Sequence, residues 1–192
     1  MSSTNRGACR IEKDYYRTPI YEIEKFLHVF NKDIMELDGK TILDPCAGGD
    51  QMNAVMPYPF ALEKYTDGFN QFTIDIREDS PARVHCDYLT KDIGGNKFDL
   101  IISNPPFSLA QEFIDKALKD VVVGGYVVMF LPLNYLGTDK RRDWWLNKMP
   151  KYICVHSHRP SFTPDGKTDS REYAHFIWQK PLAPQCSKLF II

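Results

Sequence analysis

The sequence predicts an α/β protein with a seven-stranded, mostly parallel β-sheet and helices on both of its faces. Short apolar runs of strand length alternate with stretches in which apolar residues recur at helical spacing. Strands that alternate with helices form crossover units, and such units place successive strands parallel in one sheet. The last two apolar runs are joined by a loop without helical spacing, which favours an antiparallel hairpin at one edge of the sheet.

Seven apolar runs are expected to form the strands. Each is short, as strands of globular domains are, and is bounded by polar or turn-forming residues. In chain order the runs are Thr41–Asp44, Phe72–Ile76, Arg83–Cys86, Phe98–Ser103, Tyr126–Leu131, Tyr152–His156 and Glu172–Gln179.

Four stretches are expected to be helical. The first covers residues 19–35, because Ile23, Leu27 and Phe30 recur at helical spacing after Pro19, a residue suited to a first helical turn. The other three are Asp50–Tyr65, Ser108–Val121 and Asp139–Lys148. Two prolines fall inside the first of these three, where proline opposes a continuous helix.

The totals indicate one soluble domain. A chain of 192 residues holds one full core and leaves little room for a second. No apolar run approaches the roughly 18 residues of a membrane span, and the amino-terminal residues show no apolar signal segment, so the sequence predicts a cytoplasmic protein. The five cysteines are odd in number and widely spaced, which indicates reduced thiols. Residues 1–13 are expected to be loosely held.

The charge is unevenly distributed along the chain. The net charge is −1, which argues against a basic nucleic-acid-binding protein as a whole. Residues 31–100 contain 7 Lys and Arg against 13 Asp and Glu, whereas residues 134–180 contain 9 against 5. A polyanion could therefore bind the later segment although the total charge does not show it.

Open α/β sheets bind ligands at the carboxyl ends of their strands, so the residues after each strand are the candidates. The first strand runs into Asp44-Pro45-Cys46-Ala47-Gly48-Gly49-Asp50, where glycines allow a close backbone approach and a following helix would offer free N–H groups. Asp75 lies in the second strand and could accept two ribose hydroxyls. Asp87 and Tyr88 follow the third strand and could bind an adenine. The structural alternatives are a plain turn for the glycines and a cap or surface role for the acids.

The fourth strand ends in Asn104-Pro105-Pro106-Phe107, a pattern that suits the methylation of an aromatic amine. The lone pair of such an amine is delocalised into its ring, and acceptors for its hydrogens would redirect that lone pair. Asn104 offers a side-chain carbonyl and Pro105 a backbone carbonyl, and the prolines hold both in place without a competing N–H. Phe107 offers a face on which a base can stack.

Together these segments resemble the S-adenosylmethionine-dependent DNA adenine-N6 methyltransferases. Asp44–Gly49 resembles the cofactor loop of that family and Asn104–Phe107 its catalytic motif. Asp14-Tyr15-Tyr16-Arg17-Thr18-Pro19 resembles the segment that contacts the methionine end of the cofactor. The order of segments resembles the gamma arrangement, and the resemblance covers about residues 14–179. The nearest likeness is to short phage or prophage enzymes.

The resemblance implies a class I methyltransferase fold of the Rossmann-like type and S-adenosylmethionine as cofactor. The catalytic residues it implies are Asn104, Pro105, Pro106 and Phe107. The cofactor-binding residues it implies are Tyr16, Thr18, Pro19, Asp44, Pro45, Cys46, Ala47, Gly48, Asp75, Ile76, Asp87, Tyr88 and Asn104. This sequence departs from the family in having Gly48-Gly49 where Gly-x-Gly is commoner, and in having no block of residues for a separate target-recognition domain.

The resemblance also implies DNA as the partner, with the target base flipped out of the duplex. Basic residues interleaved with aromatic residues suit phosphates and an opened base step. The candidates for contact with DNA or the flipped base are Phe107, Phe162, Tyr173, Lys140, Arg141, Arg142, Arg159 and Lys167. The structural alternative is an ordinary amphipathic helix with core tryptophans, and a core aromatic at position 162. A homodimer or a specificity partner would compensate for the missing recognition domain.

Other readings of the sequence stay open. The same motif also serves enzymes that methylate RNA bases or protein glutamine, and a non-catalytic nucleic-acid-binding module could retain the fold. Cys154, His156 and His158 alternate and would share one face of a strand, but no further ligand pair lies at a suitable spacing, so no metal is expected. Cys46 does not stand in the setting of a cytosine-C5 nucleophile and is interpreted as a packing residue.

Overall fold

The structure is a computed structural model that describes residues 17–95, 97–162, 167–183 and 186–192. Its helices are α1 (Ile20–Asp33), α2 (Pro57–Leu62), α3 (Ala110–Asp120) and α4 (Arg142–Asn147), with 3-10 turns η2 (Gly68–Asn70), η3 (Phe107–Leu109), η4 (Leu133–Leu136) and η5 (Asp139–Arg141). Its strands are β1 (Ile42–Asp44), β2 (Gln71–Asp75), β3 (Val84–His85), β4 (Phe98–Ser103), β5 (Val121–Pro132), β6 (Tyr152–Val155), β7 (Tyr173–Gln179) and β8 (Lys188–Ile191).

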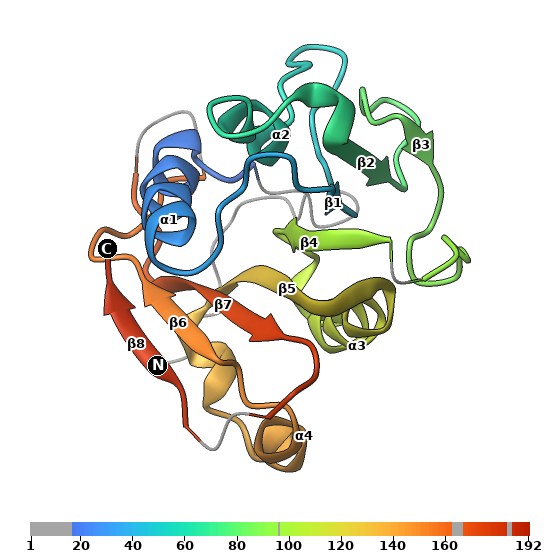
Figure 1. Ribbon diagram of the computed structural model, residues 1–192. Coiled ribbons are helices and arrows are strands. Elements are labelled where there is room, and N and C mark those ends of the chain that lie inside the picture. Colours follow the sequence, from blue (N-terminus) through green and yellow to red (C-terminus); the bar gives the residue numbers. More distant parts are fainter. Residues whose placement is uncertain (1–16, 96, 163–166, 184–185) are drawn as a thin grey trace.

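The strands form one sheet in the order β3-β2-β1-β4-β5-β7-β6-β8 (Figure 1). The pairs from β3 to β5 are all parallel, and β7 is antiparallel to both β5 and β6. The chain builds outward from β1 to β3 and then resumes on the other side of β1 with β4. Strand order therefore reverses between β1 and β4, and the crevice for a ligand is expected there.

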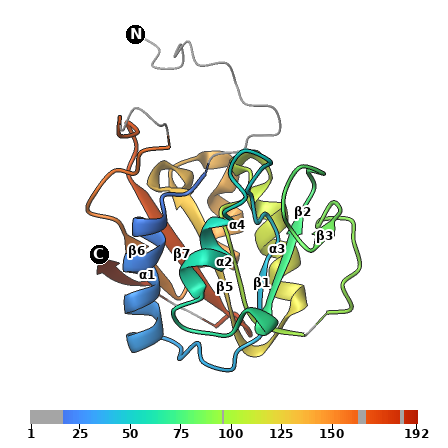
Figure 2. The same cartoon turned by 90° about the horizontal axis from the view of Figure 1, so that it is seen from above.

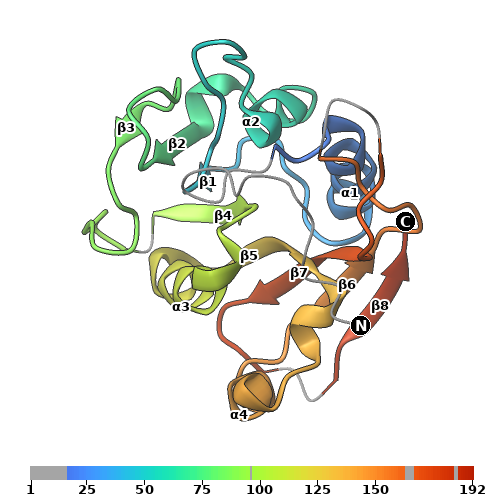
Figure 3. The same cartoon turned by 180° about the vertical axis from the view of Figure 1, so that it is seen from behind.

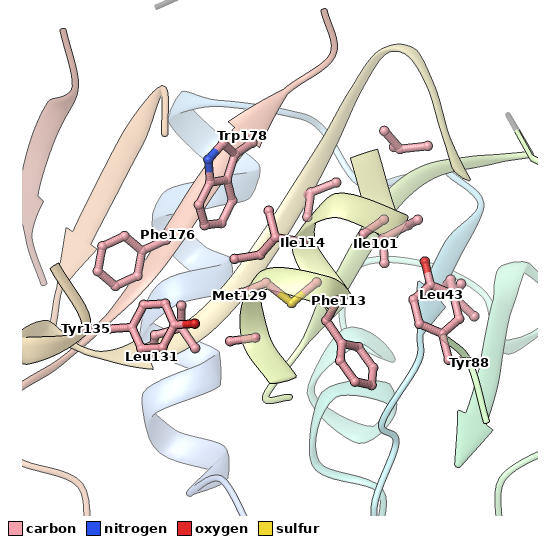
Figure 4. Close-up of a cluster of buried hydrophobic side chains, with 14 of the residues drawn as sticks. Leu43, Tyr88, Ile101, Phe113, Ile114, Met129, Leu131, Tyr135, Phe176 and Trp178 are labelled. Carbon is pink, nitrogen blue, oxygen red and sulfur yellow. The ribbon is translucent and has the colours of Figure 1, made fainter. Parts of the chain in front are cut away.

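Helices cover both faces of the sheet, as expected. Figure 2 shows α1 and α2 on one side of the sheet, with α3 and α4 on the other. Under α3 and α4 lies one buried apolar cluster, part of which is drawn in Figure 4, with Ile114 and Trp178 fully buried in it. Under α1 and α2 lies a second cluster that includes Phe26 and Phe130. Two buried layers hold the sheet between them, and this fixes the positions of the strand ends.

The helix expected over residues 50–65 is wrong in extent. It spans only Pro57–Leu62, and Pro57 stands at its first turn, where the missing N–H is not needed. Ahead of it the side chain of Asp50 accepts hydrogen bonds from the backbone N–H groups of Met52 and Asn53 and forms a turn. The glycine pair is therefore followed by a turn and not by a helix amino terminus.

The carboxyl-terminal edge also differs from the expectation. The β6–β7 pair is antiparallel as predicted, but it is not the edge of the sheet, because β8 pairs parallel with β6 beyond it (Figure 3). The strand β8 escaped prediction because it is only four residues long and mostly exposed, which gives little periodic signal.

The strand expected over residues 126–131 is longer than predicted. It begins at Val121 and passes an irregularity that contains Gly124, whose φ is +88°.

Within the described residues, no helix is long and apolar enough to cross a membrane.

Candidate functional site

A cavity lies at the reversal of strand order, at the carboxyl ends of β1, β2 and β4. Segments from seven parts of the chain line it: the residues before α1, the loop after β1, the start of α2, the end of β2, the turn after β3, the Asn-Pro-Pro segment after β4, and η3 with the first turn of α3. The sequence-predicted residues that line it are Thr18, Pro45, Cys46, Ala47, Gly48, Asp75, Ile76, Asp87, Tyr88, Asn104 and Pro106. Residues that are distant in sequence thus meet at one place, as the parallel strands require.

Asp44 ends β1 and is almost completely buried. Its Oδ1 accepts hydrogen bonds from the Ser103 hydroxyl at 2.6 Å and from the Cys46 N–H at 3.1 Å. Its Oδ2 is buried and has no hydrogen-bond partner among the described residues. Burial raises the pKa of the Asp44 carboxyl to about 7, against the two hydrogen bonds, which lower it. Asp44 Oδ2 is therefore suited to accept a hydrogen bond from a ligand, because no described residue donates one to it.

Gly48 and Gly49 bend the loop after β1 toward the end of β2. Their φ angles are +71° and +75°, in the region where glycine has no steric cost. The Gly48 N–H donates to Asp75 Oδ2 at 2.9 Å, and Arg77 bonds to the carbonyl of Gly49 and lies 3.4 Å from Asp75 Oδ1. The carboxylate of Asp75 therefore positions the glycine loop as well as lining the cavity.

The turn after β3 presents a half-buried acid and a buried ring. Asp87 Oδ1 accepts the N–H of Leu89 at 2.9 Å, which holds the turn in shape. Tyr88 lines the cavity, and its hydroxyl donates to Asp120 at 2.9 Å on the core side. Ile76, which is 54% exposed, also lines the cavity. The expected adenine-binding residues thus lie within one wall of the cavity.

Asn104 is held by a residue from the other end of the chain. Its side-chain amide nitrogen donates to the Thr18 hydroxyl at 2.9 Å, just before α1 begins. This contact ties the Asn104 side chain to the segment before α1. Pro106 lines the cavity, whereas Pro105 is buried. Pro19 caps α1 in an extended conformation, so it positions Thr18.

Three aromatic rings predicted to face a target base lie together. The ring centroids of Phe107 and Tyr173 are 6.1 Å apart, and those of Phe162 and Tyr173 are 5.1 Å apart. Tyr173 is buried and stacks on Phe130. Phe107 and Phe162 are half-buried at the border of the apolar cluster under α1 and α2. Tyr173 is thus a core residue, whereas Phe162, for which a core position was the alternative, is half-buried, as is Phe107.

The predicted basic residues come from two segments: Lys140, Arg141 and Arg142 lie at η5 and the start of α4, and Arg159 and Lys167 lie between β6 and β7. The Arg141 guanidinium lies over the Tyr135 ring, and Arg142 and Arg159 form exposed ion pairs with Asp143 and Glu172. Lys140 and Lys167 are exposed. Trp145 is buried in the core, as the structural alternative for this segment supposed.

Two further observations concern the residues that were named from sequence. Tyr16 lies outside the described residues. Among the described residues, no group of three or more His, Cys, Asp or Glu side chains could hold a metal ion.

Sequence reasoning missed several residues that line or support the cavity. Tyr58 and Arg77 line the cavity. The hydroxyl of Ser103, the last residue of β4, donates a hydrogen bond to Asp44. Tyr58 lies between two prolines, a setting that indicated only an interrupted helix. Ser103 directly precedes Asn104, so its place at a strand end was the one available signal.

No family model and no curated protein matches this chain. Solved structures do match it. A putative class I S-adenosylmethionine-dependent methyltransferase from Listeria monocytogenes aligns with a TM-score of 0.61 and 13% identity over 97% of this chain and 68% of its own. The chain has the class I methyltransferase fold.

Two restriction-modification proteins share this fold. The type I restriction enzyme EcoKI M protein aligns with a TM-score of 0.59 and 14% identity over 83% of this chain. A modification subunit of a putative type I restriction enzyme from Vibrio vulnificus aligns with a TM-score of 0.56 and 14% identity over 92% of this chain. The chain spans 43% and 49% of the lengths of these two proteins. Neighbours named as S-adenosylmethionine-dependent support that molecule as the cofactor of the fold.

Proposed function

We propose that this protein transfers a methyl group from S-adenosylmethionine to the N6 amine of adenine in DNA. The observation that carries the proposal is the position of Asn104-Pro105-Pro106-Phe107. The segment follows β4, next to the reversal of strand order, with the Asn104 amide bonded to Thr18 and the Phe107 ring beside Tyr173, which also contacts Phe162. A methyltransferase fold supplies the context, since fold alone does not determine a substrate.

The cavity residues fit the proposed cofactor. The buried Asp44 Oδ2 lacks a protein donor among the described residues, and the loop beside it has glycine where the backbone must approach a ligand closely. Asp75 and Asp87 supply acceptors for hydroxyl and amine groups, and Tyr88 and Ile76 supply apolar surface. When bound, S-adenosylmethionine supplies an electrophilic methyl group on a positively charged sulfur.

The chain's own residues would act on the target amine by positioning it. The side-chain carbonyl of Asn104 and the backbone carbonyl of Pro105 accept the amine hydrogens and direct the nitrogen lone pair toward the methyl group. Phe107 and Phe162 hold the flipped base by stacking. Catalysis then rests on orientation and electrostatic alignment. No strong base is required, because the proton leaves from an already acidic ammonium.

DNA is favoured over RNA or protein as the substrate by two observations. The restriction-modification neighbours are named as modification proteins, and the segment before α1 resembles that of the DNA enzymes. Arg142 and Arg159 are already paired with carboxylates, which indicates weak intrinsic affinity for DNA phosphates. We therefore propose one catalytic domain that acts with a specificity partner or as a homodimer.

A transfer assay tests the substrate class. The protein is incubated with S-adenosylmethionine carrying a tritiated methyl group and, in parallel, with unmethylated duplex DNA, RNA and a glutamine-containing peptide. Label in DNA alone is expected. Label in RNA or peptide alone would replace the proposed substrate, and cofactor binding without transfer to any of them would favour a non-catalytic module.

A further inference from the structure

A buried chain of four polar side chains ends at the wall of the cofactor cavity. Glu22 Oε2 on α1 lies 2.5 Å from His156 Nδ1, at the end of β6, and His156 Nε2 lies 2.8 Å from His175 Nδ1 on β7. His175 Nε2 lies 3.0 Å from the hydroxyl of Tyr58, which lines the cavity. None of the four residues is more than 2% exposed. Polar groups buried this deeply require a complete assignment of donors and acceptors.

The carboxylate end assigns the direction of the hydrogen bonds. A carboxylate oxygen accepts, so the contact with Glu22 Oε2 places the ring proton of His156 on Nδ1 and leaves its Nε2 as an acceptor. That Nε2 then accepts from His175 Nδ1, and the remaining His175 Nε2 accepts from the Tyr58 hydroxyl. The ring of His175 then carries its proton on Nδ1 and donates to His156 Nε2.

The surroundings keep this chain dry and neutral in its middle. The ring of Phe26 stacks on His175 with centroids 3.9 Å apart. Burial lowers the pKa of His175, so its ring stays uncharged. Burial also raises the pKa of Tyr58, so its hydroxyl keeps its proton. Lys25 is the nearest cation to the acidic end, 3.8 Å from Glu22.

We propose that the Glu22–His156–His175–Tyr58 chain fixes the Tyr58 oxygen as a hydrogen-bond acceptor toward the cavity and thereby favours a positively charged ligand over its neutral counterpart. Because the hydroxyl hydrogen is committed to His175, only lone pairs of the oxygen remain for the cavity. Each hydrogen bond along the chain points toward the carboxylate, so the bonds polarise one another and make that oxygen more negative. The negative charge of the nearby Asp44 carboxyl also raises the pKa of Tyr58 and so adds to the negative potential at this oxygen.

The inference rests on the proposed function, because it names S-adenosylmethionine as the charged ligand. The demethylated product, S-adenosylhomocysteine, has the same groups without the charge on sulfur. A cavity wall with this polarity would therefore retain the methyl donor and release the product. Glu22, His156 and His175 are positioning residues in this account, and Tyr58 is the residue that faces the ligand.

The direction of the hydrogen bonds from Tyr58 to Glu22 is tested without any ligand. Long-range proton–nitrogen NMR spectra of the full chain report which ring nitrogen of each histidine carries the proton. The hydrogen-bond direction predicts a single ring proton on Nδ1 of each histidine, and His156→Gln and His175→Gln assign the two signals. Protonation of either ring on Nε2, or a doubly protonated ring, would overturn the proposed direction.

The charge preference is tested by binding. Affinities for S-adenosylmethionine and S-adenosylhomocysteine are measured by calorimetry on the wild type, Tyr58→Phe and Glu22→Gln. Each variant keeps the shape of the side chain. Tyr58→Phe should lower the affinity for the methyl donor about tenfold while changing that for the product by less than about twofold. Glu22→Gln should change the ratio of the two affinities in the same direction. Tyr126 belongs to the same apolar cluster but not to the hydrogen-bonded series, so Tyr126→Phe should leave the ratio unchanged.

The outcomes separate the two proposals. An unchanged affinity ratio in Tyr58→Phe, with both ligands bound by the wild type, overturns the inference and leaves the proposed function standing. If the wild type binds neither ligand, the proposed cofactor is wrong and the inference fails with it. A parallel loss of affinity for both ligands would show a merely structural role and also overturn the inference.

Discussion

At the scale of single residues, Asn104 shows how two distant segments of the chain determine the orientation of one side chain. Its amide nitrogen donates to Thr18, which lies 86 residues earlier. The prediction from sequence named both residues but gave no reason for them to touch, because that contact depends on how α1 packs across the sheet. Likewise the sequence indicated Asp44 as a candidate, whereas its burial and raised pKa arise only in the folded chain.

Asn104→Ala tests the assignment of the target-amine acceptor. The substitution should lower the rate of methyl transfer by roughly 10²- to 10³-fold, the usual effect of removing one well-placed polar group from a transition state. Binding of S-adenosylmethionine, measured by calorimetry, should remain largely intact. Asn147→Ala on the exposed face of α4 is the matched control. A variant with near-normal turnover would refute the assignment.

Asp44→Asn tests the buried carboxyl through stability. The folded-state pKa of Asp44, about 7, lies above the ordinary value of 3.8 for an aspartate side chain. The carboxyl therefore favours the folded state most below pH 4, and this contribution is lost as the pH rises through 7. Relative to the wild type, the variant should gain up to about 4 kcal/mol in free energy of unfolding between pH 4 and pH 8. Parallel curves of unfolding free energy against pH would contradict this account.

At the scale of elements, the order and type of the strands could be predicted because parallel strands are continuous apolar runs, as in Phe98–Ser103, which matched in full. Element boundaries followed local chemistry that periodicity does not report. Pro57 and the Asp50 turn shortened α2, and Gly124 allowed β5 to begin earlier. The cavity-lining role of Tyr58 was also beyond prediction, because α2 becomes a wall only after it packs on α1.

The loop after β1 makes a prediction at this scale. A Cβ added to Gly49 would lie 2.7 Å from the ring of Pro81, in addition to the cost of its positive φ. Gly39 has a similar positive φ of +68° with open space around it. Gly49→Ala should therefore lower the free energy of unfolding by about 1–3 kcal/mol more than Gly39→Ala. Equal losses in urea denaturation would show that the loop does not pack against Pro81 as described.

At the scale of the whole molecule, the chain has the core of a methyltransferase fold and spans less than half of its two restriction-modification neighbours. Two of the exposed basic residues proposed to hold a polyanion, Arg142 and Arg159, are ion-paired. A catalytic domain with the proposed function would place one base against its cofactor and would offer little surface for reading a long sequence.

Sequence specificity is therefore expected to be short. Mapping of methylated positions on genomic DNA treated with the isolated chain should give a recognised sequence of fewer than about six base pairs, or none. Adding a specificity partner, if one is found, should lengthen it. A long and defined site produced by the isolated chain would contradict the expectation.

The central claim is that the methyl group passes to N6 of adenine, and mass spectrometry tests it most directly. Duplex DNA is incubated with the protein and with S-adenosylmethionine carrying a deuterated methyl group, then digested to nucleosides. The account predicts deuterated N6-methyladenine in the wild-type reaction and its loss with Asn104→Ala. Deuterated methyl on cytosine, or on no base although the cofactor is bound, would contradict it.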